Sequence, residues 1–328
     1  MMTCRSSSKR ARAARGSALL TVLWISAALS AIAFSLANTV RGETERVSTD
    51  LDSLRAYYLA VGAVERASVE KLWANWFPGR VQPMEPGWID YNFPSGVSRV
   101  EIIPETSKLD INTIPENRLA LLLAAMGIDP GRAQTIVRGI IARRTTATVL
   151  SPVPSGPSFS APAASFQEIE ELLSVPGVTP EIFYGTYIPA SEGIQAGSAR
   201  LVRRGGLIDC LSVFGSGSTV EANTADPAVL AAMSIPPDGI RMLLEMRGKV
   251  RIDAARLGQL GQYLGPAGGQ LRVDGNSVYT FRATARVRLA NGQVSEVRRT
   301  VAARVKYMPA NFETWIEVLR WYDTAWSN

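Results

Sequence analysis

The pattern of hydrophobic and polar residues changes several times along this chain. Residues 17–40 are uncharged and largely apolar, a stretch longer than the roughly 20 residues that a helix needs to cross a bilayer. Apolar residues then recur at three- and four-residue spacing, with charged residues between them, until Pro78. Because proline breaks a helix interior, the spacing predicts one long helix that ends before Pro78, its first half in lipid and its second half amphipathic.

The amphipathic half of this predicted helix has an apolar ridge formed by Leu51, Leu54, Tyr58 and Val61. A helix with one apolar face buries that face against a partner or against its own sheet. We therefore predict that the ridge docks a partner, and burial against the chain's own sheet is equally expected.

Period-two alternation predicts strands at both ends of the remaining chain. Residues 88–93 and 97–103 read as a hairpin, and so do residues 278–289 and 294–307, joined by a turn at Asn291-Gly292. Residues 312–322 fit either an edge strand or a short helix. One antiparallel sheet interrupted by an insertion is the most economical arrangement, so the fold class is α+β.

The interrupting segment is helical and contains an imperfect repeat. Leu123-Ala124-Ala125-Met126-Gly127-Ile128 matches Leu230-Ala231-Ala232-Met233-Ser234-Ile235, and an Asn-Thr pair precedes each, Asn112-Thr113 and Asn223-Thr224. The side chains of Asn112 and Thr113 suit a helix start because they can accept hydrogen bonds from free N–H groups. Residues 145–164, rich in Thr, Ser, Pro and Ala, read as a flexible loop.

Composition narrows the range of functions. The chain has no histidine, which excludes Ser-His-Asp triads, Cys-His pairs and His-ligated metals. Five basic residues lie in residues 1–16, and without them 30 Lys and Arg face 29 Asp and Glu, so the basic charge belongs to the N-terminus. That asymmetry keeps the N-terminus in the cytoplasm and sends the rest of the chain across the membrane. Cys210 reads as a buried apolar thiol.

The sequence around Arg15-Gly16-Ser17 resembles a type IV prepilin leader, a short basic peptide that ends in glycine and is removed at the cytoplasmic face. The resemblance implies cleavage between Gly16 and Ser17. Most pilins and pseudopilins carry glutamate as the fifth residue after the cut, and this chain carries Thr21. A neutral residue suits a subunit with no neighbour ahead of it, because an unpaired buried carboxylate is costly.

The segment from Leu172 to Glu181, with sequence LLSVPGVTPE, and the Asn-Thr units resemble the general secretion pathway protein K family, the large minor pseudopilins of type II secretion. The resemblance implies a pilin-like sheet with an inserted all-α domain of SAM-like units. It also implies a non-catalytic tip subunit that initiates the pseudopilus for export of folded proteins across the outer membrane. The implied location is the bacterial inner membrane, single-pass, with the C-terminal domain in the periplasm.

The resemblance to this family also implies a set of partner proteins and a division of the chain into segments. The partners are the other minor pseudopilins, the major pseudopilin, the prepilin peptidase and the inner-membrane secretion platform. The predicted segments are a leader (1–16), a transmembrane helix (17–40), the first part of a pilin-like domain (41–107), a helical insertion (108–234) and the second part of the pilin-like domain (235–328).

The alternative function is a membrane-anchored helix-hairpin-helix DNA-binding protein of the competence type, since such modules also combine Ile-Asn-Thr, a Leu-rich helix and a Gly-Ile turn. Asp129 and Pro130 in the turn disfavour phosphate binding, so nucleic acid is not the expected partner. No catalytic constellation emerges, and we expect no enzyme and no required cofactor. Members of the family can bind calcium, but no motif assigns ligands or a metal site here.

Overall fold

The computed structural model describes residues 10–77, 87–149, 165–189, 201–273, 277–308 and 313–325. It divides into two compact units, Met1–Arg55 and Ala56–Asn328. The long helix α1, Arg10–Trp76, contributes to both units and ends two residues before Pro78, as the sequence predicts.

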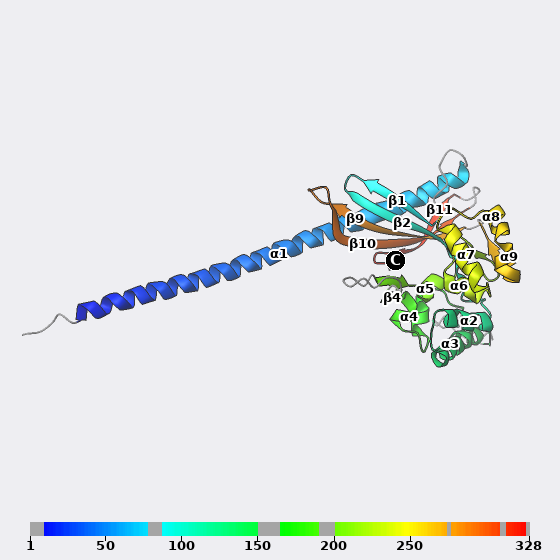
Figure 1. The fold of residues 1–328 in the computed structure, drawn as a ribbon, viewed down its shortest axis with the longest axis horizontal. Coiled ribbons are helices and arrows are strands. Elements are labelled where there is room, and N and C mark those ends of the chain that lie inside the picture. Colours follow the sequence, from blue (N-terminus) through cyan, green and yellow to red (C-terminus); the bar gives the residue numbers. More distant parts are fainter. Residues whose placement is uncertain are drawn as a thin grey trace, which may run out of the picture. The chain divides into compact units, whose positions relative to one another are not determined.

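The second unit contains a five-stranded antiparallel sheet in the order β1-β2-β9-β10-β11 (Figure 1). Strands β2 and β9 are neighbours although the helical segment separates them in sequence, which confirms one interrupted sheet. The last segment is a strand rather than a helix. The strand bounds are Trp88–Phe93 (β1), Gly96–Pro104 (β2), Val278–Arg288 (β9), Val294–Tyr307 (β10) and Ile316–Tyr322 (β11).

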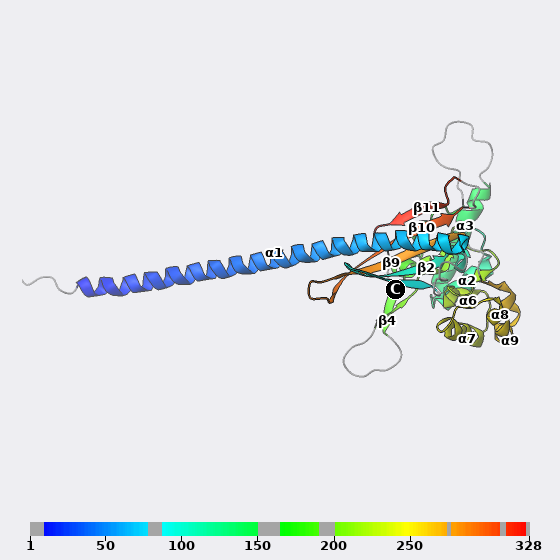
Figure 2. The same ribbon diagram turned by 90° about the horizontal axis from the view of Figure 1, so that it is seen from above.

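The C-terminal part of α1 lies along one face of this sheet (Figure 2). Ala60, Ala63 and Ala67 have no exposed surface in this contact, and their small side chains let the helix approach the strands closely. At the start of β2 the approach is closer still, because a Cβ on Gly96 would lie 2.7 Å from Leu59 Cδ2. These small residues determine where the helix seats on the sheet.

The remaining helices form a separate hydrophobic core and group together in both ribbon views (Figures 1 and 2). The helix bounds are Glu105–Ser107 (η1), Glu116–Ala125 (α2), Pro130–Val149 (α3), Ile169–Ser174 (η2), Pro180–Tyr184 (α4), Leu207–Cys210 (α5), Pro227–Ala232 (α6), Pro237–Arg247 (α7), Ala254–Gln259 (α8), Gly261–Leu264 (α9) and Gly265–Gln270 (η3). Three pairs of short strands connect them: Leu109–Asp110 (β3) with Leu211–Ser212 (β6), Thr186–Pro189 (β4) with Leu201–Arg204 (β5), and Val220–Glu221 (β7) with Leu271–Arg272 (β8).

Two boundaries differ from those predicted. The helical insertion does not end at Ser234, because Leu243, Leu264 and Leu271 belong to the same core as the preceding helices. Helix α3 continues to Val149, so residues 145–149 of the predicted loop are helical. The rest of that loop, residues 150–164, and leader residues 1–9 lie outside the described residues.

The imperfect repeat corresponds to two copies of one structural unit. The first unit opens with β3 and closes with β6, and the second opens with β7 and closes with β8; both strand pairs are parallel. At the turn after the Leu-Ala-Ala-Met helix, Gly127 has φ of 67° and Ser234 has φ of 63°. Ser234 is the single non-glycine residue with positive φ in the described part of the chain, so the repeated turn imposes this backbone conformation on it.

The Asn-Thr pairs have a role that differs from the predicted helix cap. Asn112 accepts from the Phe166 N–H at 2.8 Å and donates to the Phe166 carbonyl at 3.0 Å. Asn223 bridges the Ile252 backbone in the same way, at 2.8 and 3.0 Å. Helix α2 itself begins three residues later, after Pro115. Each asparagine therefore ties the start of its unit to a segment further along the chain.

Candidate functional site

The apolar half of α1 is exposed in the structure and meets the length and composition of a membrane-spanning helix. The Thr21 hydroxyl donates to the Ala18 carbonyl at 2.8 Å, and Ser26 and Thr39 bond in the same way within the helix. These three hydroxyl donors thus find acceptors within the helix itself. Thr21 is neutral, whereas most pilins and pseudopilins are expected to carry a glutamate at this position.

The proposed cleavage site, Gly16-Ser17, lies within the helical backbone of α1. Nothing in the structure tests whether this bond is cut, and the cleavage stays a prediction.

The predicted docking ridge has two parts with different surroundings. Leu51, Leu54 and Tyr58 are exposed, with Tyr58 65% accessible, whereas Val61 is partly buried against the sheet core. Tyr58 and the sheet-facing Ala60 are two positions apart, which places them on opposite sides of a helix with 3.6 residues per turn. The free part of the ridge is therefore Leu51, Leu54 and Tyr58, and Val61 belongs to the chain's own packing.

A buried cluster of charged and polar groups joins the sheet to the helical insertion at Glu105, in η1. The Glu105 carboxylate has no exposed surface and accepts from Thr280 Oγ1 at 2.5 Å, from Lys108 Nζ at 3.3 Å and from the Ser212 hydroxyl. The Arg304 guanidinium lies 3.8 Å away. Thr280 and Arg304 come from the sheet and Ser212 from the insertion, so one carboxylate links both bodies. Sequence inspection had not singled out Glu105, since its two hydroxyl partners, Ser212 and Thr280, lie 107 and 175 residues away in the chain.

The charge state of Glu105 follows from these neighbours. Burial alone would raise its pKa, but the Lys108 ammonium, the Arg304 guanidinium and the two hydroxyl donors lower the pKa to about 2. The carboxylate is therefore ionised at neutral pH despite its burial. A charge buried to this extent is tolerated only because it is paired and hydrogen-bonded.

A second group of ion pairs lies on the same face of the sheet. Arg282, 2% exposed, approaches Glu101 Oε2 at 2.5 Å and Asp209 Oδ1 at 3.7 Å. Asp209 also pairs with Arg203 at 2.6 Å and accepts from the Gly206 N–H at 2.9 Å. Glu105 and Asp209 are thus two separate carboxylates that anchor the insertion to the sheet, and Glu168 is a third, 3.9 Å from Arg304.

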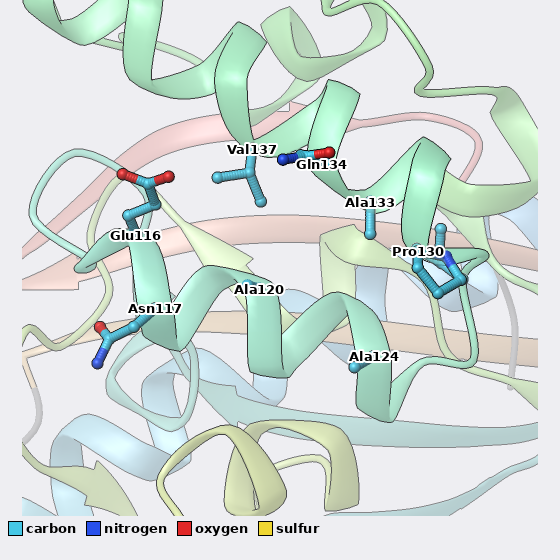
Figure 3. Close-up of a pocket in the computed structure, with 9 residues that line it drawn as sticks. Glu116, Asn117, Ala120, Ala124, Pro130, Ala133, Gln134 and Val137 are labelled. Carbon is cyan, nitrogen blue, oxygen red and sulfur yellow. The ribbon is translucent and has the colours of Figure 1, made fainter.

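An apolar groove of about 700 Å³ lies between α2 and α3 of the first unit. Figure 3 shows Ala120 and Ala124 of α2 facing Ala133 of α3, with Glu116 and Gln134 at its margin. Its walls are aliphatic and small, so it can accept apolar side chains. The lining offers no pair of groups suited to acid–base chemistry.

The turn between α2 and α3 is already occupied by the protein's own carboxylate. Asp129 Oδ2 accepts from the N–H groups of Gly131 and Arg132 at 3.0 and 3.2 Å. In the second unit Pro236 and Pro237 stand at the positions of Asp129 and Pro130, and Asp238 and Gly239 correspond to Gly131 and Arg132. A helix-hairpin-helix module holds phosphate with these backbone donors, so the first turn, whose donors already bind Asp129, disfavours the DNA-binding alternative.

The acidic side chains and the cysteine of the described residues form neither a metal site nor a reactive thiol. Among the described residues, no three His, Cys, Asp or Glu side chains lie together as a metal site requires, so calcium ligands stay unassigned. Cys210 is buried in the insertion core, in agreement with the sequence interpretation. Burial, together with nearby Asp226 and Asp209, raises the pKa of its thiol, which disfavours the reactive thiolate.

The architecture that these observations define is an α+β subunit in which a single apolar helix continues onto an antiparallel sheet and a two-unit helical domain interrupts that sheet. No protein-family model matches the chain. No curated protein matches it either.

Among solved structures, the chain is similar to one in the crystal structure of the GspK-GspI-GspJ complex from the enterotoxigenic Escherichia coli type 2 secretion system. The match covers 84% of this chain and 98% of that chain, with 16% sequence identity and a TM-score of 0.49. At this identity and TM-score, the function has to be argued from the chain's own residues.

Replacing the buried carboxylate gives a test of the junction. Glu105→Gln should lower the free energy of unfolding at pH 7 by about 3–5 kcal/mol, because Lys108 and Arg304 lose their counter-charge inside the protein. Since the pKa of Glu105 is lowered on folding, its stabilisation is complete above the unfolded pKa and is lost as the pH falls to about 2. The difference between the two proteins should therefore shrink from pH 4.5 to pH 2.

Denaturant unfolding of the detergent-solubilised protein measures this difference. Glu296→Gln is the matched control because its side chain is 99% exposed, and it should leave stability unchanged. Equal stability of the Glu105→Gln variant and the unmodified protein at pH 7 would contradict the assigned role.

Proposed function

We propose that this protein is a minor pseudopilin of the type II secretion system, a non-catalytic subunit at the pseudopilus tip that starts assembly of the filament. The observation that carries the proposal is the continuity of α1. One helix joins a charge-free apolar segment, residues 17–40, to an alanine-lined stretch that packs on an antiparallel sheet. A basic segment with the leader-like Gly16-Ser17 bond precedes the apolar part. An anchor that later becomes a filament core needs all three features.

The same features set the location and partners that we propose. The basic N-terminus stays in the cytoplasm, the apolar segment crosses the inner membrane once, and the sheet and the helical insertion lie in the periplasm. By the family resemblance, the partners are two smaller minor pseudopilins, the major pseudopilin, the prepilin peptidase and the inner-membrane platform. The GspK-GspI-GspJ complex named for the similar structure is an assembly of the same kind.

The tip position rests on Thr21 and on the size of the helical insertion. Subunits of a slim fibre stack repeatedly, and an added domain that starts near residue 108 and continues to about residue 273 obstructs stacking above it. Thr21 needs no N-terminal amine from a preceding subunit, because its hydroxyl is satisfied within the helix. Both features suit a subunit with nothing ahead of it.

Leader removal is the first expected outcome. In cells that contain a prepilin peptidase, mass spectrometry should find a mature chain that begins at Ser17. Gly16→Val should block processing because the larger side chain hinders approach to the scissile backbone, whereas Ala13→Val should still be processed. A mature chain that keeps Met1, or one cut after residue 30, would contradict the pseudopilin assignment.

The second expected outcome concerns the free part of the ridge. Leu54→Asp with Tyr58→Asp should abolish co-purification with the two smaller minor pseudopilins, because a helix interface does not accommodate buried unpaired carboxylates. Ser48→Asp with Thr49→Asp, two exposed polar positions of the same helix, should leave co-purification intact. Equal recovery of the partners with both double variants would show that the interface lies elsewhere.

The third expected outcome concerns the tip. Thr21→Glu should impair assembly or at best leave it unchanged, because a carboxylate without a cationic partner costs several kcal/mol in an apolar filament core. Thr21→Val, which keeps the size and neutrality of the side chain, should assemble normally. Immunolabelling of sheared pseudopili should find the protein at one end only, and labels spread along the shaft would rule out the tip role.

A further inference from the structure

The sheet has two chemically different faces. Alternate residues of β9 and β10, among them Phe281 and Val301, lie in the core against α1. The residues between them point to the opposite face, where the Thr284 and Thr300 hydroxyls lie 3.0 Å apart. That opposite face, here named the arginine face, carries Arg99, Arg282, Arg286, Arg288, Arg298 and Arg304.

One half of the arginine face is covered by the helical insertion. Arg282 and Arg304 are each no more than 3% exposed and lie within 4 Å of carboxylates. Two of these carboxylates, Asp209 and Glu168, come from the insertion. Inside this protein, therefore, the arginine face is covered by a surface that supplies carboxylates.

The other half of the arginine face is accessible to solvent. Arg99 and Arg286 have 59% and 39% of their side chains exposed. Arg298 is exposed and makes no ion pair within the described residues. Arg288 donates to Asn92 Oδ1 at 2.8 Å and to the Gly292 carbonyl at 3.4 Å, both of them neutral acceptors.

The carboxylates on this exposed half are few. Asp90 accepts two hydrogen bonds from the Arg99 guanidinium, at 2.7 and 2.8 Å, and is itself 57% exposed. Glu296 lies 3.6 Å from Arg286 and is 99% exposed. An ion pair as exposed as that of Glu296 contributes little, about 0–1 kcal/mol, and exchanges readily with other partners. Four guanidinium groups therefore face two carboxylates, and the surplus is positive.

We propose that this exposed half of the arginine face, formed by Arg99, Arg286, Arg288 and Arg298, is a docking surface for an acidic segment of another protein. Arg286 and Arg298 are directly opposite each other in the β9–β10 register, so the sheet holds two planar donor groups side by side. Guanidinium groups match carboxylates in bidentate geometry. The surface continues the intramolecular arginine–carboxylate layer beyond the edge of the insertion.

A protein partner fits this surface better than a polyphosphate. Beyond the first 16 residues the chain has 30 basic and 29 acidic residues, so the body lacks the general positive field that draws nucleic acid. The positive charge is confined to a rigid patch about the width of a few strands. The proposal does not depend on the tip position or on leader cleavage.

Fluorescence anisotropy with the full-length protein in neutral detergent tests the proposal. The probe is a labelled peptide of glutamates, compared with an equally long glutamine peptide. We expect the glutamate peptide alone to bind, with affinity that falls as salt rises. Arg286→Gln, Arg288→Gln and Arg298→Gln together should weaken binding about tenfold, and Arg298→Gln alone, at an exposed residue without an ion pair, should weaken it about threefold.

The matched control removes the same charge from the helical insertion through Arg138→Gln, Arg241→Gln and Arg256→Gln; Arg138 and Arg241 are exposed, and the Arg256 side chain is 44% exposed. This control should change the affinity less than twofold. Equal losses of affinity in the two triple variants would show that binding depends only on the net charge of the protein, and would overturn the proposal. It would also be overturned by failure of the glutamate peptide to bind, or by tighter binding of duplex DNA or of phosphatidylglycerol vesicles at equal charge concentration.

Discussion

The hydrogen bonds and ion pairs of the Glu105 carboxylate hold the sheet and the helical insertion together, and the rest of their arrangement depends on them. It sits where the chain leaves β2 for the insertion, and it bonds to groups from both bodies. An apolar replacement of comparable volume often stabilises a protein as well as a buried ion pair does. The charged cluster instead specifies one orientation of the insertion, because Thr280, Ser212 and Lys108 can hydrogen-bond to this carboxylate together only in that orientation.

The arginines of the sheet extend this constraint outward. Period-two alternation places apolar side chains against α1 and polar ones on the other face, so a residue such as Arg304 cannot join the helix-covered core. Its burial has to be compensated by acids from elsewhere in the chain, here Glu105 and Glu168. The insertion is thus both a helical domain and the source of carboxylates that compensate the buried arginine charges on half of the arginine face. The exposed half stays solvated because no such acids lie over it in the described residues.

The sequence predicted those features that depend on local periodicity. The end of α1 before Pro78, both hairpins and the interruption of the sheet follow from spacing and turn residues. The end of the insertion was placed too early, since α8, α9 and η3 are only four to six residues long, and their assignment depends on contacts with a core made largely from preceding residues. The Glu105 cluster was beyond reach because it is a tertiary arrangement of individually unremarkable polar residues.

The repeat shows why some positions carry more information than others. Arg144 donates to the carbonyls of Ile111 and Ile114, and Arg247 donates to the two carbonyls at the matching place in the second unit. Hydrogen bonds are directional, so both units retain the residue types that make them. Apolar contacts tolerate exchange of volume: with Pro130 aligned to Pro237, Ala133 corresponds to the bulkier Ile240. The open groove of the first unit is therefore a local difference in side-chain size on a shared backbone plan.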